Sequence, residues 1–227
     1  MGGFETIEAG GTTARLYTAG DVGHGAPGVV ILHAWWGLND DVITYADRMA
    51  AAGFAVAAPD LFDGKIATTI DDADRLSSDA DEGSCETIVA AAVDRLAERL
   101  GPDAPLAAVG FSFGAAWAIW APTERDRVRA TVVYYGTWVD SVLGRATVPV
   151  LGHFAEDDPY ETAETVTEFE QGLRDAGREA IIQRYPGTGH WFAEPSRDAY
   201  RPEDAELAFE RTVAFLRQHL EADERAG

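Results

Sequence analysis

Short apolar segments alternate with longer segments of helical periodicity along most of this chain. The segments that we expect to be strands are 28–33, 54–58, 106–110, 130–135, 148–154 and 180–185; the expected helices are 40–52, 86–100, 113–120, 162–176 and 203–220. This alternation indicates βαβ units and a mostly parallel sheet with helices on both faces. The acidic segment 63–84 is expected to be a surface loop with a short helix, either a lid over a site or a connection. The sequence therefore predicts an α/β fold.

Composition limits what the chain can bind. The formal net charge is −21, and a surface this acidic repels nucleic acid and anionic lipid. Hydrophobic residues make up 46% of the 227 residues, enough for the core of one domain. No apolar run reaches the roughly 18 residues of a membrane span, no secretory signal is evident, and the single cysteine is Cys85. We therefore expect a cytoplasmic monomer or small homo-oligomer without nucleic-acid or membrane partners.

The segment Gly110-Phe111-Ser112-Phe113-Gly114 follows one expected strand and opens the next helix. In this position G-x-S-x-G is typical of a nucleophile elbow, a tight turn that presents the serine hydroxyl at the edge of the sheet. Small residues two before and two after the serine let the neighbouring backbone approach, and the helix N-terminus stabilises negative charge. We therefore predict that Ser112 is a nucleophile; the alternative is a serine that only caps the helix.

A serine hydroxyl needs a base, and the base needs an acid that orients it. In hydrolases of this architecture the groups follow the chain order Ser, Asp or Glu, His. His190 lies in a glycine-containing loop after the last expected strand, at the same sheet edge as Ser112, and is the predicted base. Three consecutive carboxylates, Glu156, Asp157 and Asp158, follow the preceding strand. Asp158, next to a proline, is the predicted acid, with its two neighbours as alternatives.

The other histidines fit structural positions better. His24 is expected in a polar loop, His219 on the terminal helix, and His153 in a strand as a packed core residue. His33 ends the first long strand, where it either packs or touches substrate. No group of acids and histidines has metal-site spacing, and segment 20–28 lacks a phosphate-loop or dinucleotide pattern. We therefore expect no metal and no cofactor.

Five motifs together resemble the dienelactone hydrolase family of α/β-hydrolases, and the resemblance covers nearly the whole chain. The motifs are HAWWGLN (33–39), PDLF (59–62), GFSFG (110–114), AEDDP (155–159) and GHWFA (189–193), with 134–136 and 208–212 also similar. The resemblance implies a single α/β-hydrolase domain over residues 1–227 with a sheet of about seven or eight strands. It also implies that Asp158 is the acid and that the backbone N–H groups of Trp35 and Phe113 form an oxyanion hole.

Three residues depart from the family pattern. The family nucleophile is typically cysteine, and this chain has Ser112. The family often has a glutamate, which holds the resting thiol, where this chain has Ala34. Well-known members place an arginine shortly after the catalytic histidine to bind a substrate carboxylate, and here that stretch contains Glu194. Because a glutamate there would repel a carboxylate, we predict a neutral substrate.

Aromatic side chains in or beside the loops of the predicted site indicate an apolar cleft for a small ligand. The predicted substrate-binding residues are Trp36, Tyr135, Trp138, Trp191 and Glu194, and the rival interpretation for each aromatic is core packing. We predict a serine hydrolase that cleaves small, neutral, apolar carboxylic esters or lactones through an acyl-serine intermediate. Thioesterase, peptidase or acyltransferase chemistry on the same fold remains open, as does an idle ligand-binding protein.

Overall fold

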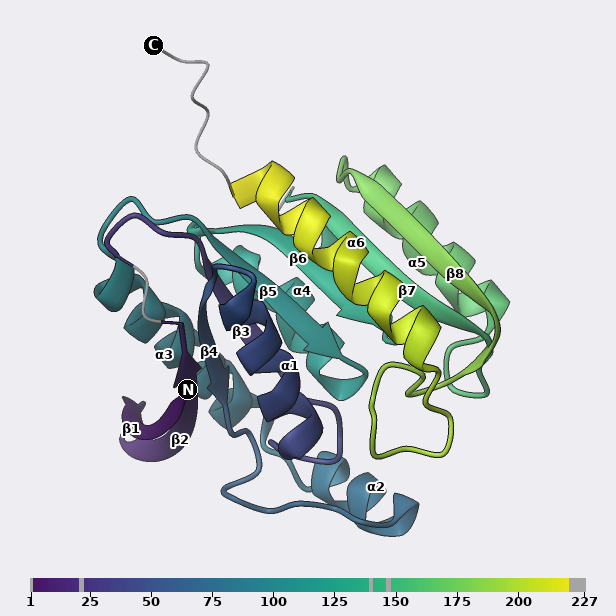
Figure 1. Cartoon of the computed structure of the whole chain (residues 1–227), viewed down its shortest axis with the longest axis horizontal. Coiled ribbons are helices and arrows are strands. Elements are labelled where there is room, and N and C mark those ends of the chain that lie inside the picture. Colours follow the sequence, from purple (N-terminus) through teal and green to yellow (C-terminus); the bar gives the residue numbers. More distant parts are fainter. Residues whose placement is uncertain (1, 21–22, 139–140, 146–147, 221–227) are drawn as a thin grey trace.

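A mixed sheet of eight strands lies between two layers of helices in the described part of the chain (Figure 1). The structure is a computed structural model that describes residues 2–20, 23–138, 141–145 and 148–220. The strands are β1 (Gly3–Ala9), β2 (Thr12–Ala19), β3 (Gly28–Leu32), β4 (Ala55–Pro59), β5 (Leu106–Phe111), β6 (Val128–Tyr134), β7 (Val150–Asp157) and β8 (Ala180–Gly189). The helices are α1 (Asp40–Ala51), α2 (Ile70–Ser78), α3 (Glu82–Leu100), α4 (Phe113–Glu124), α5 (Ala163–Asp175) and α6 (Pro202–Leu220), with a short 3-10 helix, η1 (Ser141–Gly144). None of the helices in these ranges is long and apolar enough to span a bilayer.

The strands follow the order β1-β2-β4-β3-β5-β6-β7-β8 across the sheet. From β4 to β8 all neighbours pair in parallel, whereas β1 and β2 form an antiparallel hairpin that joins the edge of β4. The parallel strands β3, β4 and β5 are buried along their whole length, which explains their continuous apolar sequences. The prediction of an α/β fold with a mostly parallel sheet of this size is confirmed.

Helices cover both faces of the sheet. α1 and α6 lie on the face nearer the viewer in Figure 1, and α3, α4 and α5 cover the far face. α1 places Val42, Tyr45, Ala46 and Met49 against the sheet, at helical spacing. Because β3 to β8 run parallel, their carboxyl ends meet at one edge of the sheet, the lower edge in Figure 1. The loops that carry Ser112, Asp158 and His190 all lie at that edge.

The structure adds the hairpin of β1 and β2, which the sequence analysis did not predict. Only the end of β1, with Ile7 and Ala9, is buried, so its apolar pattern is weak. Gly10 and Gly11 make the turn, both with positive φ. α3 begins at Glu82, earlier than the predicted residue 86, because the Asp81 carboxylate caps it. The rest of the predicted loop segment, residues 63–81, contains the expected short helix, α2.

A buried chain of hydrogen bonds joins α6 to the sheet below the site. The His153 ring contacts the Tyr185 hydroxyl at 2.8 Å through Nδ1 and Thr212 Oγ1 at 3.0 Å through Nε2. Thr212 Oγ1 also lies 2.8 Å from the Tyr134 hydroxyl, which in turn lies 3.2 Å from that of Tyr45. Burial, helped by Arg211, lowers the pKa of His153 to about 3, so the imidazole stays neutral. The prediction that His153 packs in the core is confirmed.

Candidate active site

The main chain turns sharply at Ser112, between the end of β5 and the start of α4. Ser112 has a positive φ of 47°, a conformation that few residues with a side chain adopt. A Cβ atom added to Gly110 would lie 2.2 Å from the carbonyl oxygen of Gly114, and one added to Gly114 would lie 2.2 Å from that of Leu32. The turn therefore needs glycine at both positions, and it leaves the Ser112 side chain at the sheet edge.

Ser112, His190 and Asp158 form a continuous chain of hydrogen bonds. The distance from Ser112 Oγ to His190 Nε2 is 3.0 Å, and that from His190 Nδ1 to Asp158 Oδ2 is 2.7 Å. Because the carboxylate accepts from Nδ1–H, the network assigns the free lone pair to Nε2, which can accept the Ser112 proton. The ring of His190 and the carboxylate are almost completely shielded from water. The geometry suits removal of a proton from the serine hydroxyl.

Asp158 is the one of the three consecutive carboxylates that contacts His190. Its other oxygen, Oδ1, accepts the backbone N–H groups of Tyr160 at 2.9 Å and Glu161 at 3.0 Å, which fix the carboxylate plane. Asp157 and Glu156 are exposed, and Glu156 instead accepts from the backbone N–H of Gly187. Burial and hydrogen bonding thus separate one carboxylate from two that face solvent.

The two predicted oxyanion-hole donors are the backbone N–H groups of Trp35 and Phe113. Trp35 follows β3, and Phe113 is the first residue of α4. Neither N–H donates a hydrogen bond to another group in the described part of the chain. Donors of this kind stabilise the negative charge that develops on a carbonyl oxygen during acyl transfer. The structure therefore leaves both predicted oxyanion-hole donors available.

Four aromatic rings form a cluster, here called the aromatic rim, against His190. Its members are Trp35, Trp36, Tyr160 and Trp191, whose ring centroids lie 5.2–5.9 Å apart in five contacts. The His190 ring lies 4.9 Å from Tyr160 and 5.0 Å from Trp191. The exposed Tyr160 was not among the predicted substrate-binding residues. Its position two residues after the predicted acid, Asp158, is the sequence signal that could have identified it. Its exposed or partly exposed members, Trp35, Tyr160 and Trp191, offer apolar surface beside His190.

The predicted substrate-binding residues separate into two groups. Trp138 and Trp191 are partly exposed and can present a surface to a ligand. Trp36, Tyr135 and Glu194 are buried, so the structure favours packing for them over direct contact with substrate. Sequence could not distinguish the two groups, because both belong to loops at the same edge.

Glu194 does not carry the charge that the sequence analysis gave it. Its carboxyl is buried, and its Oε1 atom accepts a hydrogen bond of 2.9 Å from the Tyr135 hydroxyl. Burial is the main cause that raises the pKa of Glu194 to about 8, and the nearby Asp41 adds to the rise. The side chain is therefore mostly neutral at pH 7, and the prediction that it repels a substrate carboxylate is corrected.

His33 has a structural role in this arrangement. Its ring is buried, with Nδ1 2.7 Å from the carbonyl oxygen of Ala34, to which it donates, and Nε2 accepting the backbone N–H of Leu61 at 3.0 Å. Burial lowers the pKa of His33, so the neutral form holds these two loops together. Of the two interpretations left open for His33, the structure favours packing.

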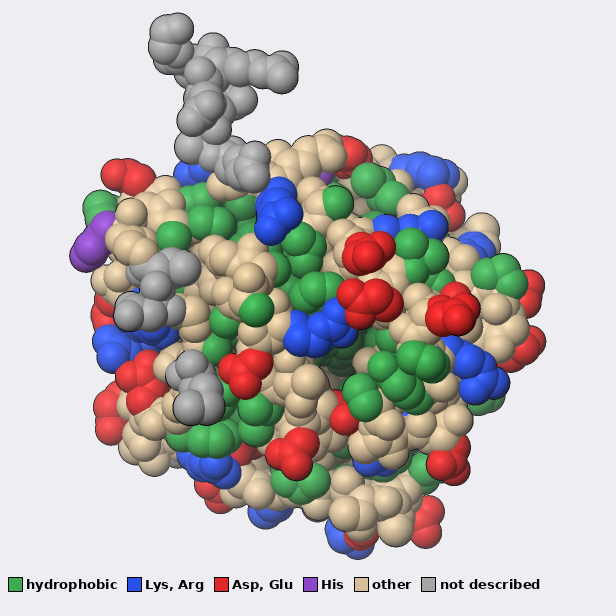
Figure 2. All heavy atoms as spheres, in the orientation of Figure 1, with side chains coloured by type: hydrophobic (Ala, Val, Ile, Leu, Met, Phe, Trp, Pro, Cys, Tyr) green, Lys and Arg blue, Asp and Glu red, His purple; other side chains and the backbone are tan. Residues whose placement is uncertain are grey.

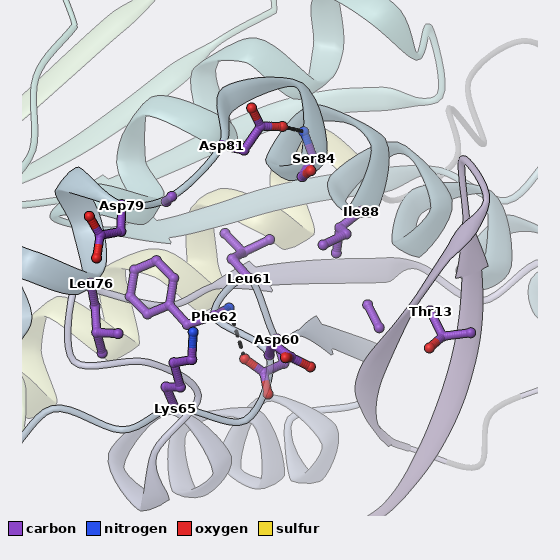
Figure 3. Close-up of a pocket in the computed structure, with 13 residues that line it drawn as sticks. Thr13, Asp60, Leu61, Phe62, Lys65, Leu76, Asp79, Asp81, Ser84 and Ile88 are labelled. Atoms are coloured by element: carbon purple, nitrogen blue, oxygen red, sulfur yellow. Dashed lines mark hydrogen bonds between the residues drawn. The ribbon is translucent and has the colours of Figure 1, made fainter.

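A separate cavity of about 380 Å³ lies beside the site, between β2, α2 and α3 (Figure 3). Its floor includes Leu61 and Phe62, and Lys65 and several aspartates surround it. The Phe62 ring lies 5.2 Å from that of Phe113, so one pair of rings separates the cavity from the turn at Ser112. The carboxylate of Asp60 is occupied by the N–H groups of Phe62 and Gly64. Within the described residues, no group of three or more acids, histidines or cysteines could hold a metal ion.

Comparison with known proteins identifies relatives over most of the chain. Residues 13–220 match the model of the "Dienelactone hydrolase family". The chain is 31% identical to "Protein usf" of Aquifex pyrophilus, over 97% of this chain and 100% of that one. It is 28% identical to a "Probable 2-oxo-3-(5-oxofuran-2-ylidene)propanoate lactonase" of Bradyrhizobium sp, over 94% and 93%. A crystal structure of a "Putative Dienelactone Hydrolase" from Klebsiella pneumoniae has the same fold, with a TM-score of 0.86 and 22% identity over 96% of this chain and 98% of that one.

The buried carboxyl of Glu194 predicts an unusual dependence of stability on pH. Between pH 4.5, the ordinary pKa of a glutamate, and about 8, the unfolded chain releases a proton that the folded chain keeps. This group therefore lowers the free energy of unfolding as pH rises through that window. The Glu194→Gln variant has no titrating group at this position, so it lacks this loss of stability. Its free energy of unfolding, relative to that of the unsubstituted protein, should therefore rise by on the order of a few kcal/mol between pH 5 and pH 8.5.

Urea unfolding at the two pH values measures this difference. The exposed Glu168→Gln variant is the matched control for loss of a carboxylate, and it should show no such growth. The prediction is contradicted if the difference in free energy of unfolding between Glu194→Gln and the unsubstituted protein is the same at pH 5 and pH 8.5.

Proposed function

Because the chain belongs to the dienelactone hydrolase family, we propose that this hydrolase cleaves small carboxylic esters or lactones through an acyl intermediate on Ser112. The observation that supports the proposal most is the chain of hydrogen bonds from Ser112 through His190 to Asp158. A nucleophile, a base and an orienting acid in this order are the parts that acyl transfer to water requires.

The proposed reaction begins when Ser112 Oγ attacks the carbonyl carbon and His190 Nε2 takes its proton. The carbonyl oxygen becomes an oxyanion, which the N–H groups of Trp35 and Phe113 bind. His190 then gives the proton to the leaving oxygen, and the ester or lactone C–O bond breaks. Water, activated by the same imidazole, attacks the acyl-serine and releases the acid. Asp158 holds the imidazole in one tautomer and stabilises its cation.

A serine nucleophile fits the surroundings of Ser112. A cysteine works as a thiolate, which needs control in the resting enzyme, whereas a serine stays protonated until a base removes its proton. Ala34, where the family often has a glutamate, offers no group that could compete for the Ser112 proton. Among the described residues, the hydrogen-bond partner of the Ser112 hydroxyl is His190 Nε2, at 3.0 Å.

We propose a neutral, apolar substrate on three grounds that do not involve the charge of Glu194. Residues 191–194, directly after His190, contain no arginine, whereas well-known family members bind a carboxylate with an arginine in that stretch. The aromatic rim provides apolar surface beside His190. The net charge of −21 disfavours the approach of anions. By contrast, the Bradyrhizobium relative is named for a lactone that carries a carboxylate.

Cytoplasmic location and a monomeric or small homo-oligomeric state remain predictions from the sequence.

A matched pair of lactones tests the substrate class. One is an unsaturated γ-lactone with a carboxylate side chain, and the other is its methyl ester, which differs mainly in charge. We expect kcat/KM for lactone ring opening to be at least about tenfold higher for the methyl ester.

Ser112→Ala gives the background rate and should also lose turnover of p-nitrophenyl acetate. A preference for the carboxylate form would reject the neutral-substrate proposal, and undiminished turnover by Ser112→Ala would reject the nucleophile.

The choice of acid predicts unequal effects of two adjacent substitutions. Asp158→Asn keeps the size of the side chain but no longer holds the correct tautomer of His190, so kcat should fall on the order of 10³–10⁴-fold. Asp157→Asn is the matched control, since the Asp157 side chain is exposed and makes no contact with His190. Its kcat for p-nitrophenyl acetate should stay within about twofold of the unsubstituted enzyme. Similar losses in both variants would contradict the assignment of Asp158.

A further inference from the structure

We propose that Tyr135 and Glu194 form a buried strut that positions His190 against Ser112, and that both are positioning residues of the reaction. The inference rests on the proposed function, because it concerns the same nucleophile and base. Among the described residues, neither side chain hydrogen-bonds to Ser112. Their role is to join the part of the chain that holds the nucleophile to the loop that holds the base.

One end of the strut is fixed to the nucleophile side of the site. Tyr135 follows β6 directly, and the carbonyl oxygen of its neighbour Tyr134 accepts the backbone N–H of Ser112 at 2.9 Å. The N–H of Tyr135 donates to the carbonyl oxygen of His153 at 2.7 Å. Tyr135 has a positive φ of 38°, and a buried tyrosine in this conformation is strained. The surrounding hydrogen bonds hold the strained turn and aim the ring at His190.

The other end lies in the loop of the base. Glu194 is four residues after His190, and its N–H donates to the carbonyl oxygen of Trp191, which keeps the loop in a tight turn. The Tyr135 hydroxyl donates to Glu194 Oε1 at 2.9 Å. Between these ends, the Tyr135 ring packs 5.0 Å from the His190 ring and 5.6 Å from that of Phe192. The imidazole is thus supported on one side by Tyr135 and on another by the aromatic rim.

The Tyr135–Glu194 pair buries polar atoms at a cost in free energy that a pair of apolar side chains would not have. The second oxygen of Glu194, Oε2, is buried and has no hydrogen-bond partner in the described residues. Burying a polar group without a partner is unfavourable, and such exceptions in native proteins call for an explanation. An apolar pair of the same size would pack without this cost. A tyrosine and a carboxyl buried at this cost directly behind the base point to a role in positioning it.

A small pocket reaches Glu194 from the outer face of the molecule. It is lined by residues from α1, from the end of β5 and from the loop before α6: Asp41, Val42, Tyr45, Phe111, Ala193 and Glu194. Figure 2 shows the molecule hollowed in this region, between α1 and the loop that precedes α6. The pocket places the carboxyl of Glu194 close to the outer face of the molecule.

Ionisation of Glu194 should weaken the support of His190. The charged groups that face Glu194 are Asp41 from α1 and Arg197 from its own loop, and Tyr135 is the titratable group on the strand side. Burial raises the pKa of Glu194 to about 8 and holds the pKa of Tyr135 well above its usual value. Above pH 8 the strut therefore contains a buried carboxylate. The Tyr135 hydroxyl still donates to it, and this bond favours the charged form, but burial, the largest cause of the raised pKa, and repulsion by Asp41 oppose it.

The test compares kcat and KM of four variants for p-nitrophenyl acetate across pH 6–10. Tyr135→Phe keeps the ring and removes the hydrogen bond, so kcat should fall about tenfold with KM nearly unchanged. Glu194→Leu should cause a similar fall in kcat. Glu194→Gln still accepts from Tyr135, so it should keep kcat at pH 7 and lack the decrease near pH 8 that we expect of the unsubstituted enzyme. Tyr17→Phe, which removes a 2.7 Å bond to Asp47 far from the site, is the matched control and should be unchanged.

The results separate the strut from the proposed function. If the unsubstituted enzyme turns over the ester in a Ser112-dependent way while Tyr135→Phe and Glu194→Leu keep kcat within about twofold, the strut is rejected and the function stands. If the unsubstituted enzyme shows no Ser112-dependent turnover, the proposed function itself is rejected. Loss of kcat at pH 7 in Glu194→Gln, or an unchanged alkaline decrease, also overturns the strut. Circular dichroism and thermal unfolding confirm that each compared variant is folded.

Discussion

The turn at Ser112 is the constraint on which the rest of the site depends. A residue with positive φ between a buried parallel strand and a helix requires the two elements to approach at backbone distance, which only glycine at positions 110 and 114 permits. That approach places the hydroxyl at the carboxyl edge of the sheet and leaves the Phe113 N–H free beside it. The loops after β7 and β8 reach the same point because their strands run parallel to β5. One backbone conformation thus determines where the nucleophile, the base and the acid can meet.

Most of the fold could be predicted, because parallel strands buried on both faces have continuous apolar sequences. The β1–β2 hairpin could not, since only part of it is buried and its pattern resembles that of a loop. For the site, the roles of Ser112, Asp158 and His190 could be predicted from the motifs and from the strands that precede them. The structure brings the three side chains together. The roles of Tyr135, Trp36 and Glu194 were not readable. A sequence shows which residues share a loop but not which side of the loop faces the core.

Charge is distributed in a way that composition alone could not show. The chain has a large excess of acidic residues, yet several of its buried titratable groups are shifted toward their neutral forms: His33 and His153 by lowered pKa, and Tyr135 and Glu194 by raised pKa. Burial is the first cause in each case. Asp158, held by two backbone N–H groups and His190, is the buried carboxylate that hydrogen bonds from three donors satisfy. The acidity thus lies mainly at the surface, where it acts on the approach of ligands.

Covalent labelling by a fluorophosphonate tests the central claim most directly, because the reagent reacts with serines that a base has activated. After labelling of the folded enzyme, digestion and mass spectrometry locate the adduct. The account predicts one phosphonylated residue, Ser112, and loss of labelling in His190→Ala, whose folding is checked by circular dichroism. An unlabelled enzyme, an adduct at another serine, or undiminished labelling of Ser112 in His190→Ala would contradict it.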